Sequence, residues 1–114
     1  MRGLRQQTSS KKHLSDKVFW SKVFKSGKEV LVAICDEELL DRTLIQGRLR
    51  VKISSSFYGG SLVDDAAAEE MMRKSTSGNL FGKKIIALAE KAGFITKENI
   101  ILIDGVPHTQ FVNI

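Results

Sequence analysis

The sequence of 114 residues contains one cysteine, Cys35, and one proline, Pro107. A single cysteine excludes an intramolecular disulfide framework and agrees with a reducing compartment. With so little proline, a long disordered linker is not expected. No apolar run approaches the roughly 20 residues that a membrane-spanning helix needs, and the N-terminus lacks the apolar stretch of a secretory signal. The sequence therefore predicts a cytoplasmic protein with no membrane partner.

Motifs of known catalytic machinery are also missing from the sequence. Neither the phosphate-binding pattern G-x-x-x-x-G-K-[ST] nor the dinucleotide pattern G-x-G-x-x-G occurs. There is no G-x-S-x-G nucleophile motif, and zinc lacks its usual ligands. The acids between Asp36 and Asp41 do not have the loop spacing of a calcium site. We therefore expect no cofactor and no metal, and we assign no catalytic residue.

Positive charge is concentrated in the first quarter of the chain. Residues 1–28 hold eight of the 18 Lys and Arg residues and one acid, whereas residues 29–114 hold ten bases and twelve acids. The two segments carry net charges of +7 and −2, in agreement with +5 for the whole chain. A basic arm on a near-neutral body is typical of proteins that bind a polyanion. We divide the chain into a basic N-terminal arm, residues 1–16, and one globular domain, residues 17–114.

The domain is predicted to begin with a β-hairpin. Residues 18–25 (VFWSKVFK) are rich in β-branched and aromatic side chains, and residues 30–35 (VLVAIC) are apolar without alternation. The glycine-containing turn at residues 26–28 joins them. The acid-rich residues 36–41 then predict a short helix capped by Asp36, because acids favour the first helical turn.

The clearest alternation in the chain covers residues 48–53 (RLRVKI). It predicts a strand on which Leu49, Val51 and Ile53 face the core. The alternating cations are predicted to share the opposite face of this strand: Arg48, Arg50 and Lys52.

Two helices and a second hairpin are predicted in the rest of the chain. Residues 64–74 have acids towards the start and bases at the end, the order that a helix dipole favours. Residues 79–92 carry a helical apolar stripe. A buried strand at residues 100–103 and a returning strand at residues 106–112 flank the turn Asp104-Gly105. The predicted fold is α+β, a mostly antiparallel sheet of about five strands, with two main helices inserted before a C-terminal hairpin and one short helix.

Four segments of the domain are distinctive: KVFKSGKEVLVAICDEELL at 22–40, FYGGSLV at 57–63, GNLFGKKIIALAEKAGFI at 78–95, and GVPHTQFV at 105–112. In this order they resemble an uncharacterised archaeal family, catalogued as domain of unknown function number four-two-four. The similarity covers about residues 17–112 and leaves the N-terminal arm outside it. Thr109 stands where the family's pattern has a small residue. The resemblance implies an archaeal, cytosolic setting connected with information processing, and it implies no activity.

Our leading hypothesis is a small non-enzymatic RNA-associated protein that binds ribosomal RNA or a translation complex, with ribosomal proteins as further partners. Cations of the arm, the first hairpin and the alternating strand would follow a phosphate backbone, and Trp20, Phe57 or Tyr58 could stack on an unpaired base. The competing explanation is that these charges keep a tail and an edge strand soluble. The predicted nucleic-acid-binding residues are Arg2, Arg5, Lys11, Lys12, Lys17, Lys22, Lys25, Arg48, Arg50 and Lys52.

The alternative hypothesis is a small enzyme or ligand-binding domain. Its pocket would contain Tyr58, Gly59, Gly60, His108 and Gln110, since glycines allow close backbone approach and a histidine can act as a general base. Each of these features also has a structural explanation, because glycine pairs form turns and strand histidines form hydrogen bonds. A module that docks an acidic protein partner is a third hypothesis.

Overall fold

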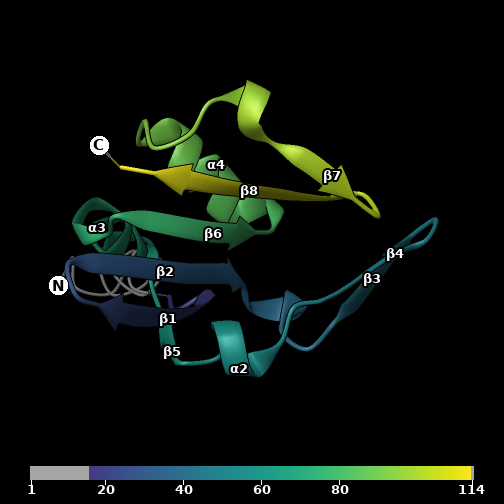
Figure 1. Cartoon of the computed structure of the whole chain (residues 1–114), viewed down its shortest axis with the longest axis horizontal. Coiled ribbons are helices and arrows are strands. Elements are labelled where there is room, and N and C mark those ends of the chain that lie inside the picture. The colour runs from purple at the N-terminus through teal and green to yellow at the C-terminus, as the bar shows by residue number, and fades with distance from the viewer. Residues whose placement is uncertain (1–15, 114) are drawn as a thin grey trace, which may run out of the picture.

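The computed structural model describes residues 16–113 and contains a six-stranded sheet (Figure 1). The described part of the chain therefore has the predicted α+β class. Neighbouring strands are antiparallel throughout the sheet, except that β2 and β6 are parallel. In spatial order the strands are β5 (Ser61–Val63), β1 (Phe19–Ser26), β2 (Glu29–Asp36), β6 (Ser77–Phe81), β8 (Val106–Val112) and β7 (Ile101–Ile103).

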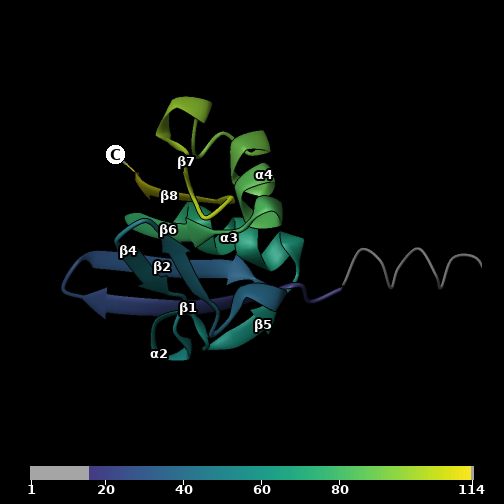
Figure 2. The same ribbon diagram turned by 90° about the vertical axis from the view of Figure 1, so that its right-hand side faces the viewer.

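Two helices cover one face of this sheet, as Figure 2 shows. They are α3 (Asp65–Lys74) and α4 (Lys83–Lys91), and they pack on a core that includes Ile34 and Leu80. The N-terminus of α3 is capped by Asp64, whose Oδ1 accepts a hydrogen bond of 2.9 Å from the Ala67 amide. Core side chains here are fully buried, so truncating one to alanine should cost about 2–5 kcal/mol.

The opposite face of the sheet carries a second, smaller core. A short helix α2 (Ser55–Tyr58) packs here together with the 3₁₀ turn η1 (Glu37–Leu39). The small hairpin of β3 (Thr43–Gln46) and β4 (Leu49–Lys52) forms a separate two-stranded sheet that contributes buried Leu44 to the same core. A second 3₁₀ turn, η2 (Lys97–Asn99), precedes β7.

Both predicted hairpins are confirmed. β1 and β2 pair in full register from Phe19 opposite Asp36 to Ser26 opposite Glu29. The turn between β7 and β8 has positive φ at both central residues, 53° at Asp104 and 79° at Gly105. These values match the type I′ turn that an Asp-Gly pair favours.

The predicted helix over residues 79–92 is wrong in its first part. Ser77–Phe81 is strand β6, which pairs with β2 on one side and β8 on the other, and α4 begins only at Lys83. Gly82 separates the two elements with a φ of 123°, a value that L side chains rarely adopt. The two large apolar residues of β6, Leu80 and Phe81, are adjacent in the sequence, so they show no alternation and merged into the apolar stripe of the helix.

The predicted core-facing strand at residues 48–53 is also wrong in length and in location. β4 spans four residues and pairs only with β3, outside the main sheet. Arg48 belongs to the turn after Gly47, and Leu49 is 46% exposed. Ile53 lies beyond the strand and is fully buried. Alternation identifies an apolar face but not the partner that covers it.

Two smaller expectations from the sequence are also not met by the structure. Ile100–Ile103 is not a buried strand, because β7 forms the edge of the sheet and Ile101 and Leu102 are 55% and 60% exposed. Asp36 precedes η1 but makes no side-chain cap for it. Its carboxylate instead caps the distant helix α4.

Candidate functional site

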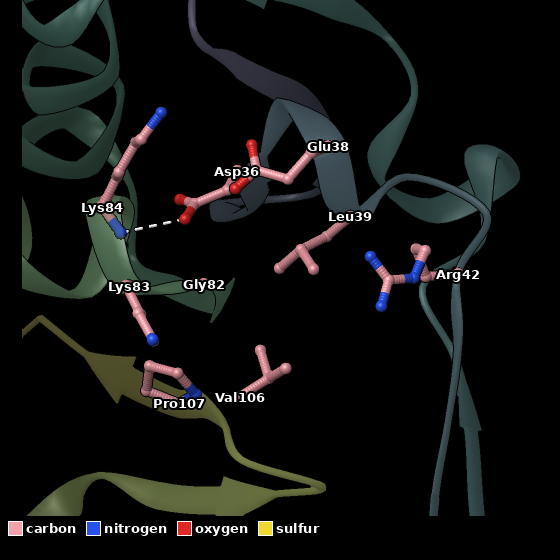
Figure 3. Close-up of a pocket in the computed structure, with 9 residues that line it drawn as sticks. All are labelled: Asp36, Glu38, Leu39, Arg42, Gly82, Lys83, Lys84, Val106 and Pro107. Atoms are coloured by element: carbon pink, nitrogen blue, oxygen red, sulfur yellow. Dashed lines mark hydrogen bonds between the residues drawn. The ribbon is translucent and has the colours of Figure 1, made fainter.

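A hollow of about 320 Å³ opens where the parallel strands β2 and β6 end and α4 begins (Figure 3). The carboxyl ends of parallel strands, beside a helix N-terminus, are a common location for ligand sites in sheets with parallel pairs. Leu39, Val106 and Pro107 form the apolar part of its lining. Charged side chains from two segments of the chain, residues 36–42 and 83–84, surround this apolar part.

Asp36 is the buried charged residue of the hollow, with 2% of its surface exposed. Its Oδ2 accepts a hydrogen bond from the Lys84 amide and its Oδ1 accepts one from the Ile85 amide, both 2.9 Å long. These two bonds satisfy amides of the first turn of α4 that have no partner within the helix. Gly82 precedes α4 and has no side chain to serve as a cap, so the carboxylate of β2 takes that role.

Burial raises the pKa of Asp36, and the nearby carboxylate of Glu38 acts in the same direction. The two amide hydrogen bonds and the charge of Lys84 oppose the rise in pKa, because they stabilise the ionised form. The positive end of α4 is thus already matched by a protein carboxylate. An external anion at this hollow would have to be held mainly by the cations around it.

Those cations are Arg42, Lys83 and Lys84, all exposed. Figure 3 shows Arg42 extending towards Leu39 from one side and Lys83 extending towards Pro107 on the other, while Lys84 points away from both. Two lysines in the first turn of a helix are unfavourable, because they face the positive end of the helix dipole. The attraction between Lys84 and the Asp36 carboxylate offsets part of this cost.

The β3–β4 hairpin adds three further cations at the same end of the molecule (Figure 1). Arg50 and Lys52 share one face of β4, and Arg48 lies in the turn after Gly47, whose φ is 60°. Besides the burial of Leu44, a hydrogen bond holds the hairpin to the rest of the domain. The Asp104 amide donates to Gln46 Oε1 at 2.8 Å, which ties the hairpin to the β7–β8 turn.

We call the following six residues the cationic end: Arg42, Arg48, Arg50, Lys52, Lys83 and Lys84. None of them forms an ion pair within residues 16–113. The ion pairs in this part of the chain join Arg73 to Glu69 and Glu70, and Lys74 to Glu70, all on the surface of α3. The positive charge of the cationic end is therefore not neutralised by direct carboxylate contacts within the described residues.

The predicted nucleic-acid-binding residues are divided between two ends of the sheet. Lys17 precedes β1 and lies at the same end as the hollow, whereas Lys25 lies near the β1–β2 turn at the opposite end. Lys22 is engaged within the protein, since its Nζ donates to the Ser56 carbonyl at 2.8 Å and lies 5.4 Å from the centre of the Phe24 ring. The remaining predicted residues lie outside the described part of the chain: Arg2, Arg5, Lys11 and Lys12.

The residues of the alternative pocket are distributed over different surfaces. Gly60 packs against Ser21 and Lys22 of β1 and lines a hollow with them. His108 and Gln110 are on β8, separated from β1 by two strands, and line a hollow with Ile101. Gly59 closes against the backbone of Ser55, within the turn that ends α2.

The ring of Phe81 lies between those of Tyr58 and His108. Its ring meets that of Phe81 edge to face at a centroid distance of 6.1 Å, and His108 stacks on Phe81 at 4.0 Å. Burial raises the pKa of Tyr58 well above its usual range. The phenol is therefore protonated at neutral pH and is not available as a base.

His108 is held in one orientation. Its Nδ1 lies 2.9 Å from the Leu80 carbonyl oxygen, which can only accept, so in the neutral ring Nδ1 carries the hydrogen. Nε2 is then an acceptor at the far end of the ring. Burial lowers the pKa of His108, and the hydrogen bond to Leu80 only partly opposes this.

Within residues 16–113, no group of three or more His, Cys, Asp or Glu side chains is arranged to hold a metal ion. Cys35 is buried, and its pKa is raised to about 12 by that burial and, secondarily, by Asp36 and Glu38. Such a thiol is neither a ligand nor a nucleophile at neutral pH. No helix in this part of the chain is long and apolar enough to cross a membrane.

Sequence reasoning missed Arg42, Lys83 and Lys84. The two lysines were not recognised as site residues because the helix was expected to begin at about Asn79, which placed them in its interior. A signal was present in the sequence, since Gly82 followed by two lysines combines a helix-breaking residue with charges that the first turn disfavours. Arg42 gave no comparable signal, because only the packing of the β3–β4 hairpin brings it to the hollow.

Comparison with known proteins supports one family assignment. A family model described as "Protein of unknown function (DUF424)" matches residues 24–114. Among solved structures, the chain is similar to an uncharacterised conserved protein from Methanopyrus kandleri, with a TM-score of 0.70 and 25% sequence identity. The similarity covers 82% of this chain and 89% of that one. No curated protein sequence matches.

Proposed function

This chain belongs to the DUF424 family, and we propose that it is a non-enzymatic protein that binds RNA through its cationic end. The observation that carries the proposal is that six cations from three segments, Arg42, Arg48–Lys52 and Lys83–Lys84, lie at one end of the molecule and have no ion pair within residues 16–113. Ribosomal RNA is the proposed target, and the cytoplasm is the proposed location. The basic N-terminal arm and Lys17 would extend the same contact.

The main energetic contribution would be the release of counterions from the phosphates. Each cation that neutralises a phosphate of a single strand adds about 0.7 to the slope of log affinity against log salt concentration. Six contacts would therefore give a slope of about −4 by the same rule. Such a polymer would also give a role to the two lysines in the first turn of α4, a position that the helix dipole disfavours.

The shape of the β3–β4 hairpin supports the proposal. It is a two-stranded ribbon outside the main sheet, anchored at its base by Leu44 and Ile53. Such a ribbon can lie along an RNA strand with its cations against the phosphates. Ile45 and Leu49 are 52% and 46% exposed on the ribbon and offer apolar contacts to sugars or bases beside the cations.

The proposal is tested by measuring the binding of fluorescent single-stranded RNA, and co-sedimentation with ribosomal particles, over a series of salt concentrations. The variant Arg48→Gln/Arg50→Gln/Lys52→Gln should lower the salt slope by about 2. The matched control is Arg73→Gln/Lys74→Gln/Lys97→Gln, which removes the same charge. In the control, Arg73 and Lys74 are paired with acids of α3.

Salt-dependent RNA binding that is weakened by the hairpin variant and retained by the control supports the proposal. Equal losses in the two variants would show attraction to net charge alone, with no site at the cationic end. If the wild-type protein neither binds RNA nor sediments with ribosomal particles at low salt, the proposed function is wrong.

A further inference from the structure

We infer that the uncovered face of β6 and β8 binds an unpaired nucleobase, so that the protein recognises bases as well as phosphates. This inference rests on the proposed function, because the polymer at the cationic end is taken to be RNA. The base site consists of Asn79, Ile101, His108 and Gln110, which lie on one face of three neighbouring strands. Nucleobases that are not paired are the usual targets of sequence-dependent RNA recognition.

The fold leaves this face open. Helices α3 and α4 cover the other face of the sheet, and in Figure 1 the front of β6 and β8 is unobstructed. Among the described residues, α2 and the β3–β4 hairpin pack over Cys35 and Phe81 but not over Gln110, which is exposed. Ile101 opposite His108 is 55% exposed, although it is a large apolar residue.

The strand register fixes the arrangement of the site. Asn79 is directly opposite Gln110, Phe81 is opposite His108, and Ile101 is opposite His108 on the other side. With about 4.8 Å between strands and about 3.3 Å per residue along them, these residues cover roughly 7 by 10 Å. This area accommodates one flat heteroaromatic ring system above the sheet.

His108 presents an acceptor to that ring. Its imidazole is clamped between the Leu80 carbonyl and the face of Phe81, with ring planes 22° apart. The bond at Nδ1 leaves Nε2 without a hydrogen, at the end of the ring farthest from the backbone. A ligand must therefore bring an N–H to this position.

Gln110 and Asn79 form an amide pair on adjacent strands. Gln110 Nε2 donates to Asn79 Oδ1 at 2.9 Å. Whichever way the two amides are assigned, one donates to the other, and the pair retains a free carbonyl oxygen and free N–H groups. Because an amide can accept from an amino group and donate to a ring nitrogen at once, it suits the edge of adenine.

The hollow beside β8 is lined by uncharged residues. Its volume is about 430 Å³, and Asn99, Ile101, His108, Thr109 and Gln110 line it, none of them carrying a formal charge at neutral pH. A phosphate or carboxylate would find no counter-charge among these residues. A neutral, flat, polar ring needs no counter-charge, and the strand that carries it would continue towards the cationic end, which lies at the right-hand side of Figure 1.

The chemistry of the site therefore favours a base with an exocyclic amino group beside a ring-nitrogen acceptor, as in adenine and cytosine. Adenosine and cytidine, titrated separately by NMR, should shift the signals of the His108 ring and of the Gln110 side-chain amide. Ribose at the same concentration should shift neither. This measurement involves no phosphate and so does not depend on the cationic end.

A second experiment uses a 12-nucleotide oligoadenylate and an abasic strand of the same length and charge. Gln110→Ala should weaken oligoadenylate binding about tenfold, the scale of one lost base contact, and leave the abasic strand unaffected. The hairpin variant Arg48→Gln/Arg50→Gln/Lys52→Gln should weaken both. Gln110 is exposed, so this substitution leaves the core intact.

The outcomes separate the two proposals. If wild-type protein binds both strands equally and nucleosides shift no site signal, the base site is wrong while RNA binding through phosphates stands. If nucleosides shift both signals but neither strand binds, the base site stands and the cationic end is not an RNA anchor. If only an extended peptide shifts these signals, the face docks protein and the inference is overturned.

Discussion

The carboxyl group of Asp36 occupies the space in which a side chain at Gly82 would begin, since a β-carbon there would overlap the Asp36 carboxyl carbon. Strand β2 and helix α4 are joined through this contact, because the same carboxylate caps the helix. The missing side chain, the positive φ and the buried cap form one local structure. The orientation of Lys83 and Lys84 at the candidate site depends on it.

Gly82→Ala should lower the free energy of unfolding by about 2–4 kcal/mol, because it adds both backbone strain and an overlap with a buried carboxylate. The control is Gly93→Ala, which also has a positive φ, 85°, but has no atom within 4 Å of the added carbon. The control should lose only about 1–2 kcal/mol, from backbone strain. Denaturant unfolding of both variants measures the difference, and equal losses would contradict the Asp36 contact.

Lys83→Ala should have opposite effects on stability and on binding. Removing a cation from the first turn of α4 should raise the free energy of unfolding by about 0.5 kcal/mol at low salt. The salt slope of RNA binding should fall by about 0.7. Lys28→Ala, at the far end of β2, is measured in the same two assays to test whether the first hairpin contributes to RNA binding. A variant Lys83→Ala that is less stable and binds RNA unchanged would remove this lysine from the site.

Cys35 should not react with a thiol reagent at pH 8 while the protein is folded. Burial raises its pKa to about 12, so the thiolate is scarce and the reagent has no access. The reaction should become complete when guanidinium unfolds the chain. Ser26→Cys, at the exposed end of β1, provides a thiol that should react at once in the folded protein. Rapid labelling of native Cys35 would contradict its burial.

His108 should make the protein less stable as the pH falls below about 6.5, the pKa of an unperturbed histidine. Its pKa is lowered by burial, so in the window between the lowered value and 6.5 the unfolded chain binds more protons than the folded one. The stability contributed by the neutral ring is present above this window and is lost as the pH falls through it.

Denaturant unfolding between pH 7 and pH 5 measures this effect. Wild-type protein and a His13→Gln control should lose more stability over the interval than His108→Gln, since only the last variant lacks the buried imidazole. Parallel curves for all three proteins would show that the histidine at position 108 titrates normally in the folded state.

The sequence predicted well those elements whose signals are local. The turn at Asp104-Gly105 and the hairpin around Gly27 are specified by residues that tolerate positive φ. The helix at Asp65–Lys74 has a cap and a charge order that are both visible in the sequence. The family resemblance was confirmed as well, by the match over residues 24–114.

The errors concern partners that are distant in the sequence. β6 was not recognised, because pairing with both β2 and β8 is what makes Ser77–Phe81 a strand. β5 (Ser61–Val63) was not predicted either, for the same reason. The role of Asp36 depended on a helix 48 residues later along the chain. The hollow at the cationic end arises from these non-local contacts, so its residues could not be grouped from the sequence.

The position of β8 has a consequence for synthesis on the ribosome. This strand lies between β6 and β7, and its residues are among the last 9 of the 114 in the sequence. Until Val106–Val112 has been translated, β6 is an edge with unpaired backbone groups and buried-type side chains such as Leu80. Nascent chains stalled before this point would expose an aggregation-prone edge at β6.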